Sequence, residues 1–136
     1  MLFTQKSEVD IHEMSPLALA FVGDAVLELL VRARLVGTTR LQPNRLHTVA
    51  THYVSAHAQN LELDIIEPML TDAEAAVLRR GKNASKATVA KHATVQEYRA
   101  STGFECLLGW LYLNGQLSRV HELFETLWQQ FDPNET

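Results

Sequence analysis

The sequence SPLALAFVGDAVLELLVRARLV, residues 15–36, predicts a long helix at the centre of the fold. Ser15 suits the N-cap because its hydroxyl can accept a hydrogen bond from a free backbone N–H of the first turn. Pro16 suits the first helical position because the N–H that it lacks would have no partner there. At about 100° per residue, apolar side chains cover two opposite sides of this helix. The apolar residues are Leu17, Phe21, Leu27, Val31 and Leu35 on one side and Leu19, Val22, Val26 and Leu29 on the other. We therefore expect the helix to be buried on most sides.

Two acids interrupt this apolar surface. Asp24 directly follows Gly23, and Glu28 lies one turn further along the face of Asp24. A buried, ionised carboxylate costs several kcal/mol or more unless it is paired, hydrogen-bonded or bound to a metal. For Asp24, a hydrogen-bonded core acid is the simpler alternative to a functional ligand. Glu28 can form an i,i+4 ion pair with Arg32.

Length and composition indicate one compact all-α domain. The chain has 136 residues, enough for one hydrophobic core, and its few glycines and prolines do not favour a turn-rich β fold. The net charge of −4 means that any contact with nucleic acid must come from a local patch. Cys106 is the only cysteine, which excludes a disulfide framework and fits the cytoplasm. No signal or membrane segment is recognised, and residues 1–14 are expected to be a loosely docked lead-in within the single domain 1–136.

Capping signals place the other helices. Pro43 can open one helix, and Ser55 can start another that Pro68 ends. Thr71 with Glu74, and Thr94 with Glu97, form capping boxes. Gly81 can end the first of these capped helices and Asn114-Gly115 the second, before a final amphipathic helix that begins at Leu117.

Three histidines raise the question of a zinc site. His47, His52 and His57 follow one another at five-residue steps, which turn about 140° each on a helix, whereas a zinc pair on one helix face needs a spacing of four. We therefore predict surface or hydrogen-bonding roles for them.

A basic segment follows the first capping box. No acid occurs from Ala75 to Gln96, although the whole chain is acidic. Lysine and arginine interleaved with neutral donors are typical of surfaces that contact phosphates, so the segment is a candidate RNA-binding patch. Its candidate residues are Arg79, Arg80, Lys82, Asn83, Ser85 and Lys86. A solvated loop is the alternative.

A second apolar helix, starting at Thr94, also carries an isolated acid. Glu105 lies in the run FECLLGWLYL, with Gly109 one turn later on the same face. Glycine lets helices approach closely, so a crossing of the two helices at Gly23 and Gly109 would bring Asp24 and Glu105 together. Two carboxylates repel one another without a cation, and a hard divalent cation bound through oxygen best explains the pair.

These motifs resemble the ribonuclease III catalytic domain, and most closely its short bacterial form, Mini-ribonuclease III. LAFVGDAVLELLV looks like the family's signature helix, and STGFECLLGWLYL is similar to its second metal-binding helix. Between them, LHTVATHYVSAHAQ and VLRRGKNASKATVAKHATVQEYR look like segments characteristic of the Mini form. The resemblance covers nearly the whole chain, and the combination in this order is specific.

The resemblance implies an all-α homodimer that cleaves double-stranded RNA with Mg²⁺, for which Mn²⁺ can substitute. Asp24 and Glu105 stand at the family's metal-binding and catalytic acids. Two further acids of full-length ribonuclease III are replaced by Ala20 and Thr102, as in the Mini form. Phe21, at the aromatic position of the signature, is expected at the dimer contact. The implied products carry 5′-phosphate and 3′-hydroxyl ends.

The resemblance also implies a substrate class, the precursor of 23S ribosomal RNA, with a ribosomal protein as a candidate partner that presents it. A separate double-stranded-RNA-binding domain is not expected, so the basic segment would supply much of the affinity for RNA. Two other readings stay open. One is a catalytically inactive helical module for RNA binding or dimerisation, which has no use for two buried acids. The other is a nucleotide phosphohydrolase, which normally has adjacent His-Asp ligands, and no such pair occurs here.

Overall fold

The computed structural model describes residues 7–85 and 93–135 of the chain, and these contain helices and no strands. The α-helices are α1 (Pro16–Thr38), α2 (Pro43–Val54), α3 (Ala56–Ile66), α4 (Asp72–Ala84), α5 (Val95–Leu113) and α6 (Leu117–Gln130). Short 3-10 turns are η1 (Ile11–Glu13), η2 (Glu67–Met69) and η3 (Pro133–Glu135). The all-α prediction is confirmed.

The predicted caps form at the helix starts. The Ser15 hydroxyl accepts from Ala18 N at 3.1 Å at the start of α1. Both capping boxes are complete: the Thr71 and Thr94 hydroxyls each accept from the backbone of the glutamate three residues later, and that glutamate accepts from the threonine N–H. Gly115 ends the turn after α5 with a φ of 75°, which favours glycine. These local hydrogen bonds explain why helix starts can be predicted from short motifs.

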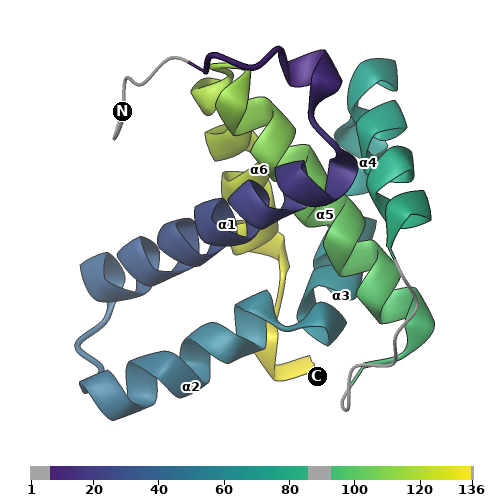
Figure 1. Cartoon of the computed structure of the whole chain (residues 1–136). Coiled ribbons are helices and arrows are strands. Elements are labelled where there is room, and N and C mark those ends of the chain that lie inside the picture. The colour runs from purple at the N-terminus through teal and green to yellow at the C-terminus, as the bar shows by residue number, and fades with distance from the viewer. Residues whose placement is uncertain (1–6, 86–92, 136) are drawn as a thin grey trace.

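The fold is organised around the crossing of α1 and α5. Figure 1 shows α1 lying across α5, with α4 and α3 on the flank of α5 and α2 beneath α1. The main core lies where α1, α3, α5 and α6 meet. Its largest fully buried side chains include Phe104, Leu27, Leu107 and Leu123.

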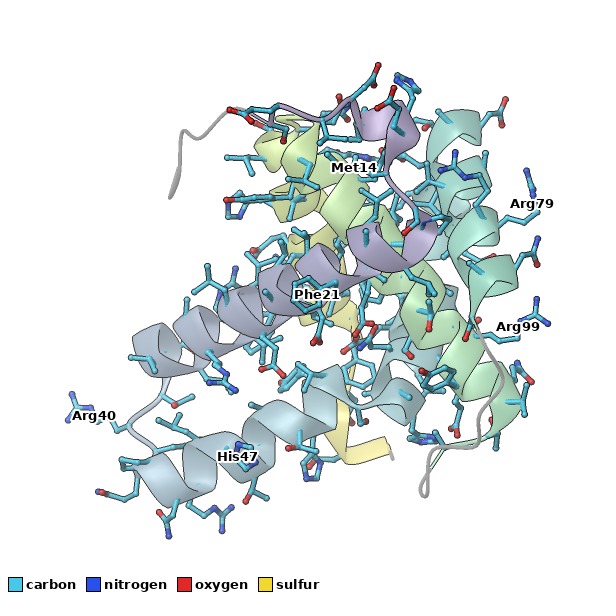
Figure 2. All side chains as sticks on the ribbon, in the orientation of Figure 1. Met14, Phe21, Arg40, His47, Arg79 and Arg99 are labelled. Atoms are coloured by element: carbon cyan, nitrogen blue, oxygen red, sulfur yellow. The ribbon has the colours of Figure 1, made fainter. Side chains whose placement is uncertain are left out.

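A smaller apolar cluster lies at the start of α1, where Leu19 and Ala20 meet Val77 of α4 and Cys106 of α5. Ile11 and Met14 of the lead-in pack against it, partly buried. Figure 2 shows Met14 at the point where the lead-in turns into α1.

A buried acid, Glu62, lies within the core. Glu62 of α3 is fully buried, and neither carboxyl oxygen has a hydrogen-bond partner among the described residues. Burial raises the pKa of Glu62 to about 9. The side chain is therefore protonated at neutral pH, because no hydrogen bond from the described part of the chain stabilises the charged form. The pKa of Tyr53 is raised by burial of its own ring and then by the charge of Glu62 in its ionised form.

Two expectations about helix surfaces are corrected. The prediction that α1 is buried on most sides is wrong: one stripe is buried, whereas Phe21 is 82% exposed and Val36 is 66% exposed. The prediction that Gly81 ends a helix is also wrong, because α4 continues to Ala84. Gly81 is instead a contact glycine, since a Cβ there would lie 2.6 Å from the Cβ of Cys106 in α5.

Among the helices of the described residues, none is long and apolar enough to cross a membrane.

Candidate functional site

The candidate site lies where two glycines let α1 and α5 touch backbone to backbone. A Cβ on Gly23 would lie 1.6 Å from the carbonyl oxygen of Glu105, and a Cβ on Gly109 would lie 1.9 Å from that of Leu19. Real Cβ atoms essentially never come closer than 3.0 Å to such neighbours. The crossing predicted from the two glycines is therefore present, and only glycine fits at either position.

The crossing brings the two predicted acids together, but their burial differs from the prediction. Asp24 is exposed, because it lies one residue past the buried stripe of α1 that contains Gly23. The expectation of a buried Asp24 carboxylate is therefore wrong. Glu105 is partly buried at the crossing. Water thus reaches the site from the side of Asp24.

The pKa of Glu105 is raised to about 7. Burial is the largest cause; a hydrogen bond from Gln59 lowers the pKa, and the charge and hydrogen bonding of Asp24 and then the charge of Glu28 raise it. The predicted ion pair of Glu28 is present, with Arg32 Nε 3.0 Å from Glu28 Oε2. Asp24 and Glu28 of α1 thus place negative charge beside Glu105 of α5.

Gln59 of α3 is a direct hydrogen-bond partner of Glu105. Its Nε2 donates to Glu105 Oε2 at 3.0 Å and to the carbonyl oxygen of Val54 at 2.9 Å. Only 1% of Gln59 is exposed. No sequence motif pointed to Gln59, because its hydrogen bond to Glu105 joins residues that are 46 positions apart.

The donor set fits a hard divalent cation. Asp24 and Glu105 supply carboxylate oxygens, the atoms that Mg²⁺ and Mn²⁺ accept, and Glu28 adds charge nearby. Burial is the main cause of the raised pKa of Glu105, and the neighbouring acids add to it. In the described part of the chain, no three side chains of the histidine, cysteine, aspartate and glutamate types are grouped as a metal site. A cation here would keep several waters.

The histidines lie apart from this crossing. The His57 ring pairs with Glu97, and the His52 Nδ1 lies 3.4 Å from the carbonyl oxygen of Pro133. His47 is exposed on α2, as Figure 2 shows. The hydrogen-bonding and surface roles predicted for these residues are the ones observed.

The basic segment contains exposed cations and residues that already contact other side chains. Arg79 and Arg80 are exposed on α4, whereas Lys82 lies 3.4 Å from Glu67 Oε1. The Asn83 Oδ1 accepts from Arg99 Nη2 at 3.0 Å, so it is already engaged by a cationic side chain of α5. Figure 2 shows Arg79 and Arg99 pointing outward on the same flank.

The described part of this segment belongs to α4 as far as Ala84, so it is helical there and not a loop. Arg99 also donates from Nε to the carbonyl oxygen of Lys82 at 3.1 Å, which binds the last turn of α4 to α5. The Ser85 hydroxyl accepts from Thr102 at 3.3 Å. Lys86 lies outside the described residues. Arg99 is thus a fixed cation beside the segment, and its position shortly after the acid-free run was the available sequence signal.

Phe21 lies on the outward side of α1. Its ring faces the viewer near the middle of the helix in Figure 2, with 82% of the residue exposed. Leu17, one turn earlier, is 44% exposed. An aromatic ring in water beside a second apolar side chain is a surface feature typical of a protein contact.

Comparisons with known proteins agree with the fold and the motifs. The ribonuclease III domain matches residues 17–116. The chain is 46% identical to Mini-ribonuclease 3 of Enterococcus faecalis over 116 residues, which cover 84% of this chain and 88% of that protein. It is 42% identical to Mini-ribonuclease 3 of Brevibacillus brevis, over 89% of this chain and 92% of that protein.

A crystal structure of protein FN1578 from Fusobacterium nucleatum has a similar fold, with a TM-score of 0.79 and 29% identity. The match covers 87% of this chain and 96% of that one. The residues that carry the signature, the crossing of the helices and the extent of these matches lead to one assignment. This chain belongs to the ribonuclease III family, in its Mini-ribonuclease 3 group.

Proposed function

We propose that this chain is a metal-dependent endoribonuclease that hydrolyses double-stranded RNA. The observation that carries the proposal is the meeting of Asp24 and Glu105 at the crossing of α1 and α5, in a chain of the ribonuclease III family. A helical module that only binds RNA gains nothing from two acids held side by side at a helix crossing. The residues 1–136 form one catalytic domain in this proposal.

Asp24 and Glu105 are the proposed ligands of a divalent cation, Mg²⁺ or Mn²⁺ in its place. When bound, the cation would activate a water for in-line attack on phosphorus and stabilise the leaving 3′-oxygen. The exposed side of Asp24 leaves room for a phosphate to approach the site. The products would carry 5′-phosphate and 3′-hydroxyl ends, and no covalent nucleophile from the protein is required.

RNA would be held by charge outside the site. Arg79 and Arg80 are exposed on α4 and are proposed to contact phosphates, while Lys82, Asn83 and Ser85 shape the end of that helix. A-form RNA offers phosphates and 2′-hydroxyls across a wide minor groove, which suits contacts of this kind. Lys86 stays a prediction from the sequence.

A homodimer would cut both strands. Two sites related by a twofold axis can each cut one strand of a duplex, and exposed Phe21 is proposed to lie at the contact between protomers. The precursor of 23S ribosomal RNA is the proposed substrate, in the cytoplasm, with a ribosomal protein as a candidate presenting partner. These finer assignments rest on the family resemblance.

The test is cleavage of a long RNA duplex by the purified chain with Mg²⁺ or with chelator. We expect staggered double-strand cuts only with the metal, and a loss of at least about a hundredfold in Asp24→Asn and in Glu105→Gln. Both changes preserve shape and remove one ligand charge. Glu13→Gln is the matched control, because Glu13 is an exposed acid in η1, outside the crossing.

The inactive RNA-binding module would behave differently. It would retard the duplex in a gel without cutting it in any divalent metal, and the acid variants would bind as the original chain does. Cleavage at the normal rate by either acid variant at limiting Mg²⁺ would contradict the assignment of the ligands.

A further inference from the structure

Gln59 is a buried amide with its donor side fully used. Both hydrogens of Nε2 have acceptors: the carbonyl oxygen of Val54 at 2.9 Å and Glu105 Oε2 at 3.0 Å. Its Oε1 is buried and has no hydrogen-bond partner among the described residues. A buried acceptor without a partner lowers the stability of a protein by about 1 to 3 kcal/mol. Gln59 is therefore not the residue that best stabilises this position of the core.

The contacts allow one orientation of the amide. Turning the group over would place Oε1 against the Val54 carbonyl oxygen and the Glu105 carboxylate, which are both acceptors. The amide therefore presents its NH₂ to Glu105, and one oxygen of that carboxylate, Oε2, is taken by the protein. The hydrogen bond from Gln59 does not involve the other oxygen, Oε1.

The donor is anchored by the junction of two helices. Val54 is the last residue of α2, and Ser55 alone separates it from the first residue of α3. Ser55 caps both helices: its N–H donates to the Thr51 carbonyl oxygen, and its hydroxyl accepts from Ala58 N at 3.1 Å. The Val54 carbonyl that orients Gln59 is thus held on rigid elements, which is the arrangement that a precise site needs.

The Glu105 carboxylate needs a hydrogen bond of this kind, because the neighbouring negative charges disfavour its ionised form at the crossing. Asp24 and Glu28 both repel the Glu105 carboxylate. Without a donor from the protein, repulsion would favour side-chain rotamers of Glu105 that point away from Asp24 and Glu28. Binding a cation would then require a change of rotamer, which lowers the metal affinity. Hydrogen bonds to the ligands of a metal commonly contribute tenfold to a hundredfold in metal affinity.

We propose that Gln59 is a positioning residue that holds the Glu105 carboxylate ready for the divalent cation. The proposal rests on the function proposed above and extends it to a third helix, α3. Gln59 does not contact the cation in this assignment, and it acts through Glu105.

The test compares Gln59→Met, which keeps the length and apolar volume and removes the donor, with Leu63→Ala. Leu63 lies one turn later in α3 and is 2% exposed, so its truncation perturbs the same helix without touching Glu105. Binding of Mn²⁺ alone, followed by electron paramagnetic resonance without RNA, gives the metal affinity. Urea unfolding gives stability, and Mg²⁺ titration of cleavage gives the metal requirement.

We expect Gln59→Met to weaken Mn²⁺ binding about tenfold and to raise the Mg²⁺ concentration for half-maximal cleavage by a similar factor. Excess Mg²⁺ should restore most of its rate. Leu63→Ala should lower stability and leave both metal values unchanged. If Gln59→Met does not fold, Gln59→Asn, which keeps an amide but is too short to reach Glu105, should show the same loss of metal affinity.

Other outcomes overturn the proposal. If Gln59→Met is destabilised like Leu63→Ala but binds Mn²⁺ normally, Gln59 has a structural role only, and the proposed function stands provided that Asp24→Asn loses the metal. If the original chain and Asp24→Asn bind Mn²⁺ alike and neither cleaves RNA, the proposed function itself fails, and the role of Gln59 fails with it.

Discussion

The contact between Gly23 and the backbone of α5 can be tested by adding one methyl group. In Gly23→Ala the Cβ would lie 1.6 Å from the Glu105 carbonyl oxygen and 2.5 Å from its carbon. Ordinary contact begins at 3.4 Å, so α1 and α5 would have to separate by about 1.8 Å, the difference between the two distances. The obstructing atoms are backbone, which cannot move aside as a flexible side chain can.

The expected loss of stability follows from two opposed effects. Overpacking a core usually costs about 1 to 3 kcal/mol, and a backbone clash belongs at or above the upper end. Alanine in place of glycine in a helix recovers about 1 kcal/mol. We therefore expect the free energy of unfolding to fall by at least about 2 kcal/mol, which urea denaturation followed by circular dichroism measures.

Activity should fall further than stability. Asp24 is on α1 and Glu105 on α5, so separating the helices moves the two proposed ligands apart. A displacement of about 1 Å in a catalytic arrangement can cost about a hundredfold in rate. Cleavage of duplex RNA at saturating Mg²⁺, at a temperature where the variant is folded, measures this loss.

Gly37→Ala is the matched control in the same helix. No atom lies within 4 Å of a Cβ at Gly37, and its φ is not positive. This variant should be as active as the original chain and more stable by up to about 1 kcal/mol. A Gly23→Ala protein that unfolds and cleaves like the original chain would refute the account of the crossing.

Three further changes test other parts of the molecule. The pKa of Glu62 is about 9 in the folded protein, whereas an unburied glutamate has a pKa of 4.5. Between these pH values the folded protein holds a proton that the unfolded chain has lost. The free energy of unfolding should therefore fall as the pH rises through this range. Glu62→Gln should remove this slope and add up to about 3 kcal/mol at pH 7, and equal pH curves in urea denaturation would contradict it. Replacing Arg79 and Arg80 by alanine should weaken duplex binding and flatten its salt dependence by about 0.7 to 0.9 for each lost phosphate contact. An unchanged slope would place the RNA elsewhere. Phe21→Asp should shift sedimentation towards the monomer, whereas Val36→Asp, also exposed on α1, should not.

Much of the helical framework could be predicted from the sequence because its signals are local. A capping hydroxyl and the N–H that it accepts from are three residues apart, so Ser15 and both capping boxes are visible in short motifs. The crossing was also predictable, since Gly23 and Gly109 each lie near an isolated acid in an apolar helix. Glycine in such a place signals a close approach of backbones.

The burial of individual side chains was decided by tertiary structure. An apolar helix such as α1 does not reveal which of its sides faces the core, so the exposure of Asp24 depends on how α1 docks on α5. Gly81 looked like a helix end, and only the proximity of α5 shows that it is a contact position.

The long-range polar contacts were beyond the sequence for the same reason. Gln59 reaches Glu105, and Arg99 reaches Asn83, across 46 and 16 residues, and no periodicity links their positions. The sequence by itself thus determined where helices start and which helices carry acids, since helix starts depend on hydrogen bonds within a turn. It also marked Gly23 and Gly109 as positions where backbones can approach closely, since glycine has no side chain. Tertiary structure alone decided which acid meets water and which side chain supports it, because both depend on the angle at which separate helices pack.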